Sequence, residues 1–331
     1  PDYNPNVYNR TEEGLAYPKE TDKDSPLFNR AISGSYPPAS TIKPFLGLLG
    51  LEEKIIQEST IINDTGVFQI DGEGRKYRGW KEEGHGEVNL HKAIVESSDV
   101  YFYELASELT IDKISNFLSS FNFGKQTGID LINESSSILP DRNWKLGNIG
   151  EPWFKGDTVN IGIGQGYINV TPLQLASSVS ALATKGKIFR PKLVERLGDQ
   201  VIEPELLFSI DLSTEKNWET IEKSMISVIN SWNGTAHNLY KEGGITIAGK
   251  TGTAQIKSLI DQDLTVKEEY EDIREIEKNR DHALFVSYGP LPNPNLTVVV
   301  IVENGESGSS VAAPIAMKLM QLYQKEILKD V

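Results

Sequence analysis

The stretch that decides the fold is residues 245–256, which read ITIAGKTGTAQI. Its β-branched residues predict a strand. Because side chains alternate along a strand, Thr251 and Thr253 face one way and Lys250 the other. Gly252 has no side chain, so we expect a ligand backbone to approach here and pair as an added strand. A β-bulge at the glycine is the structural alternative.

A serine and a lysine lie three residues apart upstream, in the sequence STIK at 40–43, just after the double proline at 37–38 and Ala39. This spacing places both on one face of a helix, so the Lys43 amine can reach the Ser40 hydroxyl. A serine needs a neighbouring base to become a nucleophile. Lys43 is that base only if burial or a nearby positive charge lowers its pKa, and Lys250 could supply the charge. The same spacing at Ser213 lies in a polar segment, where we expect no catalytic role.

A third motif, Ser97-Ser98-Asp99, interrupts a long helical period. Its functional interpretation is that Ser97 relays a proton between Lys43 and a leaving amine while Lys250 holds it. The structural alternative is a serine-rich break, with Asp99 capping the next helix. The two interpretations can hold for different residues.

The order and spacing of the motifs carry more weight than any one of them. Ser97 follows Ser40 by 57 residues and precedes Lys250 by 153. The set is typical of penicillin-binding proteins and serine β-lactamases. In such a site the Thr251 and Thr253 hydroxyls would bind a carboxylate. The backbone N–H groups of Ser40 and Thr253 would form an oxyanion hole, each worth about 10²–10³ in rate.

The composition excludes several classes of protein. A formal net charge of −14 over 331 residues argues against a nucleic-acid partner. The absence of cysteine excludes a thiol nucleophile, a disulfide framework and a thiolate metal site. No apolar run approaches the roughly 20 residues that span a bilayer, and no signal peptide is visible. The abrupt start at Pro1 predicts a piece of a longer protein.

Hydrophobic periodicity predicts the remaining elements. The predicted helices are 42–51, 89–109 with the serine break inside, 111–121 with Gly124 as its C-cap, 172–184 and 312–328, with Pro44 and Pro314 tolerated in first turns. The predicted strands are 188–196, 245–256, 283–288 and 296–302. The last is β-branched from Thr297 to Val302 and is expected to be a central strand buried on both faces. Residues 135–160 read as a loop, and the charged stretch 267–280 as a solvated helix or excursion.

Beyond the motifs, the chain resembles the penicillin-binding protein 2 family, the monofunctional class B transpeptidases of bacterial cell elongation. The resemblance covers essentially the whole chain and is carried by LFNRA at 27–31, GHG at 84–86, GDT at 156–158, IGQGY at 163–167, TPLQL at 171–175 and DHA at 281–283. It implies an α/β (α+β) transpeptidase fold, with a five-stranded antiparallel sheet flanked by helices and a mainly helical lobe holding the serine loop.

The resemblance also implies an organisation. Residues 1–331 would form one transpeptidase domain, with a helical lobe at about 44–184 and a sheet lobe mainly at 185–331. A membrane anchor, a pedestal domain and the first strand of the family's catalytic domain would lie outside this chain.

Two departures from the family pattern bear on the site. Ala39 precedes the nucleophile where glycine is common. Asp99 ends the serine loop where many penicillin-binding enzymes have asparagine, which resembles the elongation subgroup and weakens a class A β-lactamase assignment.

A metal site is a further point of comparison. Some members of the subgroup carry zinc on aspartates, a histidine and a cysteine. Asp64 and His85 could match two of these ligands, but Gly79 and Ser98 occupy the other two positions. Two ligands do not hold a structural zinc well. We therefore expect no metal and no cofactor.

The resemblance implies a peptidoglycan D,D-transpeptidase at the outer face of the bacterial inner membrane. Its partners would be stem peptides, β-lactams bound covalently at Ser40, a membrane glycosyltransferase and elongation-complex proteins. The alternatives are a D,D-carboxypeptidase, a β-lactamase or a β-lactam sensor that does not turn over. The expected catalytic residues are Ser40, Lys43, Ser97 and Lys250, and the expected substrate-binding residues are Asp99, Thr251, Gly252 and Thr253.

Overall fold

The computed structural model describes residues 25, 27–72, 74–256 and 275–326. Most of the predicted charged stretch 267–280 lies outside these residues. In the described ranges, no helix combines the length and apolar character needed to cross a membrane.

The secondary structure alternates short strands with helices along the chain. In order, the elements are α1 (Arg30–Ser33), η2 (Ala39–Ile42), α2 (Lys43–Glu52), β1 (Ile62–Asp64), β2 (Val67–Gln69), β3 (Lys76–Arg78), β4 (Gly86–Val88), α3 (Leu90–Val95), α4 (Asp99–Glu108), α5 (Ile111–Ser120), α6 (Arg142–Ile149), α7 (Lys155–Gly162), α8 (Pro172–Ala183), β5 (Lys187–Phe189), β6 (Arg196–Leu197), β7 (Gln200–Val201), β8 (Leu206–Ser209), α9 (Glu215–Asn230), η3 (His237–Leu239), β9 (Ala248–Ala254), η4 (Glu277–Asn279), β10 (His282–Gly289), β11 (Leu296–Val302), η5 (Gly308–Ala312) and α11 (Ala313–Glu326).

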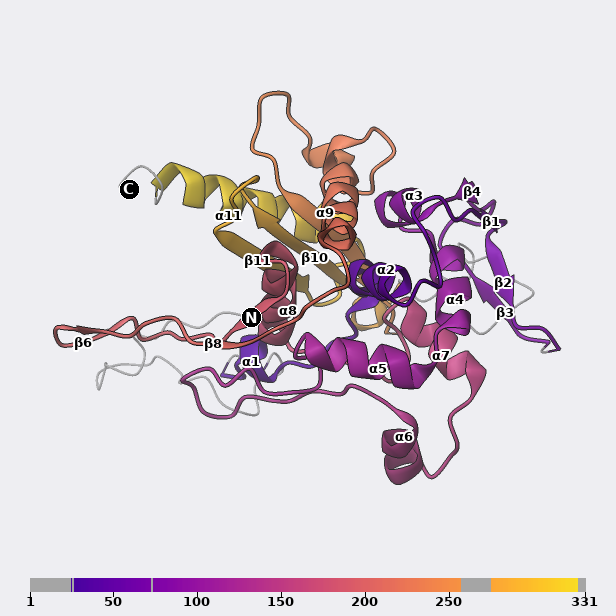
Figure 1. The fold of residues 1–331 in the computed structure, drawn as a ribbon, viewed down its shortest axis with the longest axis horizontal. Coiled ribbons are helices and arrows are strands. Elements are labelled where there is room, and N and C mark those ends of the chain that lie inside the picture. The colour runs from indigo at the N-terminus through magenta and orange to yellow at the C-terminus, as the bar shows by residue number, and fades with distance from the viewer. Residues whose placement is uncertain (1–24, 26, 73, 257–274, 327–331) are drawn as a thin grey trace.

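An antiparallel sheet of order β11–β10–β9 forms the centre of one side of the molecule. Helices α8 and α11 pack against β10 and β11 from opposite sides, and α9 packs against β9 (Figure 1). In the described residues the sheet has three strands, where the resemblance implies five. The predicted strand at 296–302 is present as β11; among the described strands it lies at the edge of the sheet and is half-buried, where a central strand buried on both faces was predicted. Within this sheet β10 is the buried central strand and β11 the half-buried edge strand. Composition does not distinguish these positions, because β-branched residues suit both.

The predicted helices are present where the helical hydrophobic period extends over many residues. The predicted helices 42–51, 172–184 and 312–328 correspond to α2, α8 and α11, and the serine break separates α3 from α4. The predicted C-cap at Gly124 is wrong, because α5 ends at Ser120 and Asn122 takes the left-handed position with φ 71°. The predicted strand at 188–196 is also wrong between Phe189 and Arg196: β5 ends at Phe189, Pro191 follows, and Arg196 begins the separate strand β6.

The predicted loop at 135–160 contains two helices that begin with side-chain caps. The Asp141 carboxylate accepts a hydrogen bond of 2.6 Å from the Trp144 amide at the start of α6. The Asp157 carboxylate accepts one of 2.8 Å from the Phe154 amide at the start of α7. These caps satisfy amides that would otherwise be unpaired. They outweigh the glycine and asparagine content that predicts a loop.

Helix α2 lies at the centre of the hydrophobic core and fixes the position of the predicted site. Its residues from Lys43 to Gly50 are all buried, and it packs against α3, α4, α5 and α9. Phe45 makes edge contacts with Phe121 and Phe123 at centroid distances of 5.1 and 5.3 Å. Because α2 is surrounded by these helices, the residues at its N-terminal end are held rigidly.

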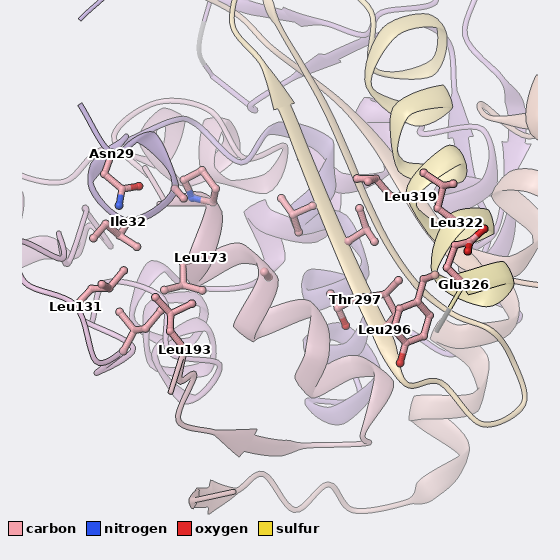
Figure 2. Close-up of a pocket in the computed structure, with 17 residues that line it drawn as sticks. Asn29, Ile32, Leu131, Leu173, Leu193, Leu296, Thr297, Leu319, Leu322 and Glu326 are labelled. Atoms are coloured by element: carbon pink, nitrogen blue, oxygen red, sulfur yellow. The ribbon is translucent and has the colours of Figure 1, made fainter. Parts of the chain in front are cut away.

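A separate apolar pocket of about 830 Å³ lies along β11 (Figure 2). Leu296 and Thr297 of β11, Leu173 of α8, and Leu319 and Leu322 of α11 contribute to its walls. None of the predicted catalytic residues lines it. The pocket is therefore distinct from the site described below.

Replacing Phe45 with alanine should lower the free energy of unfolding by about 3–5 kcal/mol, because it leaves a cavity among the surrounding rings. The matched control is Ile132→Ala, at a side chain that is 83% exposed, which should change it by at most about 0.5 kcal/mol. Denaturant titration measures both. Equal effects of the two substitutions would contradict the central position of α2.

Candidate active site

Three segments distant in sequence meet at one place in the fold. They are the turn η2 that carries Ser40, the break between α3 and α4 that carries Ser97, and the strand β9 that carries Lys250. The turn η2 contacts both β9 and β10, and α9 contacts α3 and β9. The structure thus brings all three predicted motifs together.

The turn before Ser40 is held in an unusual conformation. Ala39 has φ 49°, in the left-handed region that favours glycine, and its amide donates a hydrogen bond of 2.9 Å to the Gly164 carbonyl. A Cβ on Gly164 would lie 2.2 Å from the Ala39 carbonyl oxygen, so the two backbones touch directly. This geometry accounts for the glycine that is common at position 39 in the family. Here alanine adopts it at an energetic cost.

Lys43 is fully buried and its amine is directed at the serine loop. Nζ donates to the Ser97 carbonyl at 2.8 Å, to the Ser97 hydroxyl at 3.2 Å and to Asp99 Oδ1 at 2.7 Å. These three bonds use all three ammonium protons. No hydrogen bond joins the Ser40 hydroxyl to this amine in the part of the chain that the structure describes, although the spacing allows one. Burial lowers the pKa of Lys43, and the charge and hydrogen bond of Asp99 act against that effect.

Lys250 is also fully buried and reaches the same hydroxyl from β9. Its Nζ donates to Ser97 Oγ at 2.9 Å and to the Thr251 carbonyl at 3.1 Å. Burial, and after it the positive charge of Lys43, lower the pKa of Lys250 well below its ordinary value. Asp99 bonds to Lys43 and not to Lys250. The sequence predicted that burial or the charge of Lys250 lowers the pKa of Lys43; burial is the cause at Lys43, and the charge of Lys43 in turn lowers the pKa of Lys250.

The serine loop divides its functions among its three residues. Ser97 has φ 59°, a left-handed conformation, and presents its hydroxyl to both lysines. Ser98 is the N-cap of α4 and accepts a hydrogen bond from the Tyr101 amide at 3.2 Å. Asp99 is the first residue of α4 and pairs with Lys43. The prediction that Asp99 caps the helix is wrong, because the Ser98 oxygen reaches that amide.

Strand β9 is regular through the KTGT motif, which excludes a bulge there: Thr251 pairs with Phe285 and Thr253 with Ala283. Thr253 is exposed, whereas Thr251 is buried. A Cβ on Gly252 would lie 2.9 Å from Thr41 Cγ2. The glycine is thus required for β9 to pack against the turn that carries Ser40, the predicted nucleophile, besides any role toward a ligand.

Two side chains at the site were missed by the sequence reasoning. The Thr235 hydroxyl lies 2.8 Å from the Thr251 hydroxyl. Trp80 donates its backbone N–H to Asp99 Oδ2 at 2.9 Å and its indole N–H to the Ser97 carbonyl at 3.1 Å. Neither belongs to a recognisable motif. The features that could have pointed to them are weak. Thr235 follows a glycine in the turn after a long helix, and Trp80 is a tryptophan that is 56% exposed.

The residues at the positions where some members of the subgroup bind zinc do not fit the metal. Asp64 Oδ2 lies 2.6 Å from His85 Nδ1 and accepts a hydrogen bond of 2.6 Å from Ser98, while Oδ1 accepts from the Gly66 amide at 2.8 Å. Burial alone would raise the pKa of Asp64, but the hydrogen bonds from His85 and Ser98 lower it overall. Gly79 offers no ligand. In the described ranges, no three acidic, histidine or cysteine side chains are grouped to hold a metal ion.

A match to the penicillin binding protein transpeptidase domain extends over residues 1–321, so the chain belongs to this family. The peptidoglycan D,D-transpeptidase MrdA of Haemophilus influenzae is 40% identical to it over 314 residues, which are 94% of this chain and 48% of that protein. The protein of the same name from Escherichia coli K12 is 36% identical over 320 residues, 94% of this chain and 49% of that protein. The chain thus spans about half the length of these relatives.

Solved structures agree with this assignment. Pseudomonas aeruginosa PBP2 in complex with WCK 5153 has a TM-score of 0.83 and 37% identity, over 93% of this chain and 65% of that chain. Helicobacter pylori PBP2 in complex with MreC has a TM-score of 0.78 and 32% identity, over 93% of this chain and 53% of that chain. The resemblance to penicillin-binding protein 2 and the mixed transpeptidase fold are therefore confirmed.

The buried lysines predict a pH dependence of stability. The folded protein keeps Lys250 neutral at pH values where the unfolded chain protonates it, up to about 10.4. The unfolded state therefore binds more protons, and the free energy of unfolding rises with pH from the folded pKa to that value. Lys250→Met should reduce this slope.

The control for this experiment is Lys241→Met, at an exposed lysine, which should leave the slope unchanged. Denaturant titrations between about pH 7 and 9.5, below the titration of unperturbed tyrosines, give the slopes. Parallel curves for wild type and Lys250→Met would contradict the depressed pKa.

Proposed function

We propose that this chain is the catalytic domain of a peptidoglycan D,D-transpeptidase that forms an acyl-enzyme on Ser40. The observation that carries the proposal is the Ser97 hydroxyl, shared by two buried lysines beside the turn that holds Ser40. Such a hydroxyl can pass protons between the lysines and a reacting group. Family membership and the MrdA relatives support the same reaction class.

Activation of Ser40 requires a neutral Lys43. Because Asp99 pairs with Lys43 and burial lowers the pKa of Lys250, Lys250 can take a proton from Ser97 while Ser97 takes one from Lys43. Lys43 then accepts the Ser40 proton as Ser40 Oγ bonds to the carbonyl carbon of the penultimate D-alanine. A base of this kind is typically worth about 10²–10⁴ in rate.

The remaining steps return the protons. As the C–N bond breaks, Ser97 gives its proton to the departing D-alanine amine and is reprotonated by one of the lysines. A neighbouring stem amine then attacks the acyl carbonyl and loses its proton to the neutral lysine. Ser40 Oγ leaves the carbonyl carbon with a proton, which restores the starting state.

Substrate positioning is assigned to β9. The Thr251 and Thr253 hydroxyls would bind the terminal carboxylate, with Thr235 supporting Thr251 through its 2.8 Å contact. The backbone N–H groups of Ser40 and Thr253 would stabilise the oxyanion. Asp99 would hold Lys43 in place through their ion pair of 2.7 Å. β-Lactams would enter by the same route and acylate Ser40.

The wider setting belongs to the longer protein of which we propose this chain is part. The chain would form one transpeptidase domain, with a helical lobe at about 44–184 and a sheet lobe mainly at 185–331. A structure of Helicobacter pylori PBP2 contains MreC, and another relative forms part of a peptidoglycan synthase complex. We propose elongation-complex proteins and a membrane glycosyltransferase as partners, at the extracytoplasmic face of the inner membrane, with no metal or cofactor.

The test is the intact mass of the protein after incubation with a penicillin, followed over hours. Wild type should gain one stable adduct, and Ser40→Ala should gain none because the attacking oxygen is absent. Ser213→Ala is the matched control, since it removes the serine of the second S-x-x-K copy and should acylate like wild type.

Absence of an adduct on folded wild type, or an adduct that persists in Ser40→Ala, would contradict the proposal. A transient adduct with penicillin hydrolysis would favour the β-lactamase or D,D-carboxypeptidase alternative. A stable adduct without any cross-linking by the full-length protein in its complex would favour the sensor alternative.

A further inference from the structure

We propose that residues 62–72 and 74–88, named the clamp, position Ser97 for the reaction through direct hydrogen bonds, without a metal ion. Asp64 and Trp80 act in it as positioning residues. The inference rests on the proposed function, because Ser97 matters only if it relays protons.

Ser97 needs external support to keep its conformation. Its φ of 59° lies in the left-handed region, and a non-glycine residue there costs on the order of 1–3 kcal/mol and persists only where the surroundings over-determine it. Ser97 must also hold its hydroxyl within reach of both lysines, at 3.2 and 2.9 Å. The loop lies between two helices and has few bonds of its own, notably the Ser98 amide to the Ala93 carbonyl at 3.0 Å.

The clamp contributes one bond to each of the three residues of the serine loop. The Trp80 indole N–H donates to the Ser97 carbonyl at 3.1 Å. The Ser98 hydroxyl donates to Asp64 at 2.6 Å. The Trp80 amide donates to Asp99 Oδ2 at 2.9 Å, which leaves Oδ1 of Asp99 for Lys43. Removing the clamp would therefore disturb every residue of the motif.

The anchor on the clamp side is itself rigid. Asp64 is 2% exposed, and its carboxylate also binds the Gly66 amide at 2.8 Å and His85 Nδ1 at 2.6 Å. Strands β1 and β4 pair Asp64 with Gly86, next to His85. The Trp80 and His85 rings lie 5.5 Å apart. Asp64 thus ties the loop to a strand pair, and both of its carboxylate oxygens are engaged in hydrogen bonds.

Ser98 has a second function that a test must separate from the clamp. Its oxygen caps α4 by accepting from the Tyr101 amide, so Ser98→Ala loses a cap as well as the bond to Asp64. Asp64→Asn keeps the cap and the side-chain shape but replaces an accepting oxygen by an N–H₂ group. Trp80→Phe keeps a ring beside His85 and removes the indole bond alone.

The experiment measures acylation of Ser40 by a fluorescent penicillin under stopped flow, separating the dissociation constant of the first complex from the acylation rate constant. Asp64→Asn and Trp80→Phe should each lower the acylation rate constant by about 10-fold or more, because small displacements of a reacting group are costly. The dissociation constant should stay within about 2-fold. The acylation rate constant of the double variant Asp64→Asn/Ser98→Ala should be no lower than that of the slower single variant, because both substitutions remove the same bond between Ser98 and Asp64.

The matched control is Thr110→Ala, which removes the N-cap of α5 away from the site. It should lower the melting temperature as Ser98→Ala does and keep the wild-type acylation rate. If wild type acylates and both clamp variants keep its rate constant within about 2-fold, or if additive losses appear in the double variant, the inference fails. If wild type itself does not acylate, the proposed function fails first. Stoichiometric zinc in the purified wild-type protein, measured by mass spectrometry of the metal, would also overturn the metal-free clamp.

Discussion

The site depends on one constraint: two buried lysines share a single serine oxygen. Lys43 and Lys250 both donate to Ser97 Oγ, so two potential positive charges lie together in a region closed to water. Burial of charge is costly unless it is paired, and only Lys43 has a carboxylate partner, Asp99. The arrangement therefore favours one proton fewer than two ordinary lysines would hold. A site that lacks a proton in this way can accept one from Ser40.

Two of the positions with positive φ lie at the proposed site. Ala39, next to Ser40, has φ 49° and Ser97 has φ 59°. Neighbouring residues hold both conformations. Gly164 packs directly against the Ala39 backbone, and the clamp makes hydrogen bonds to the loop around Ser97. Strain of this kind persists when the surrounding structure is rigid. The fully buried helix α2 supplies that rigidity on the lysine side.

The sequence allowed the motifs and their grouping to be predicted, because spacing on a helix and alternation on a strand are local properties. Helix α2 and strand β9 follow from period and composition alone. Other features depend on contacts across the fold. The edge position of β11 depends on which strands pair with it, and the helices α6 and α7 depend on caps at Asp141 and Asp157.

The electrostatics of the site could be predicted only in outline. The sequence placed a second lysine near Lys43, but it could not show which of the two Asp99 would contact. Trp80 and Thr235 lie far from the motifs in sequence, and only the fold brings them to the site. The same holds for the bond between Asp64 and Ser98, which are 34 residues apart.

The most direct test of the shared serine oxygen is a crystal structure of the protein after reaction with a penicillin. The account predicts a covalent bond from Ser40 Oγ to the former β-lactam carbonyl carbon, with that carbonyl oxygen on the amides of Ser40 and Thr253. Ser97 Oγ should remain within hydrogen-bond distance of both Lys43 and Lys250. An acyl group on another residue, or a Ser97 hydroxyl turned away from the two amines in the acylated protein, would contradict it.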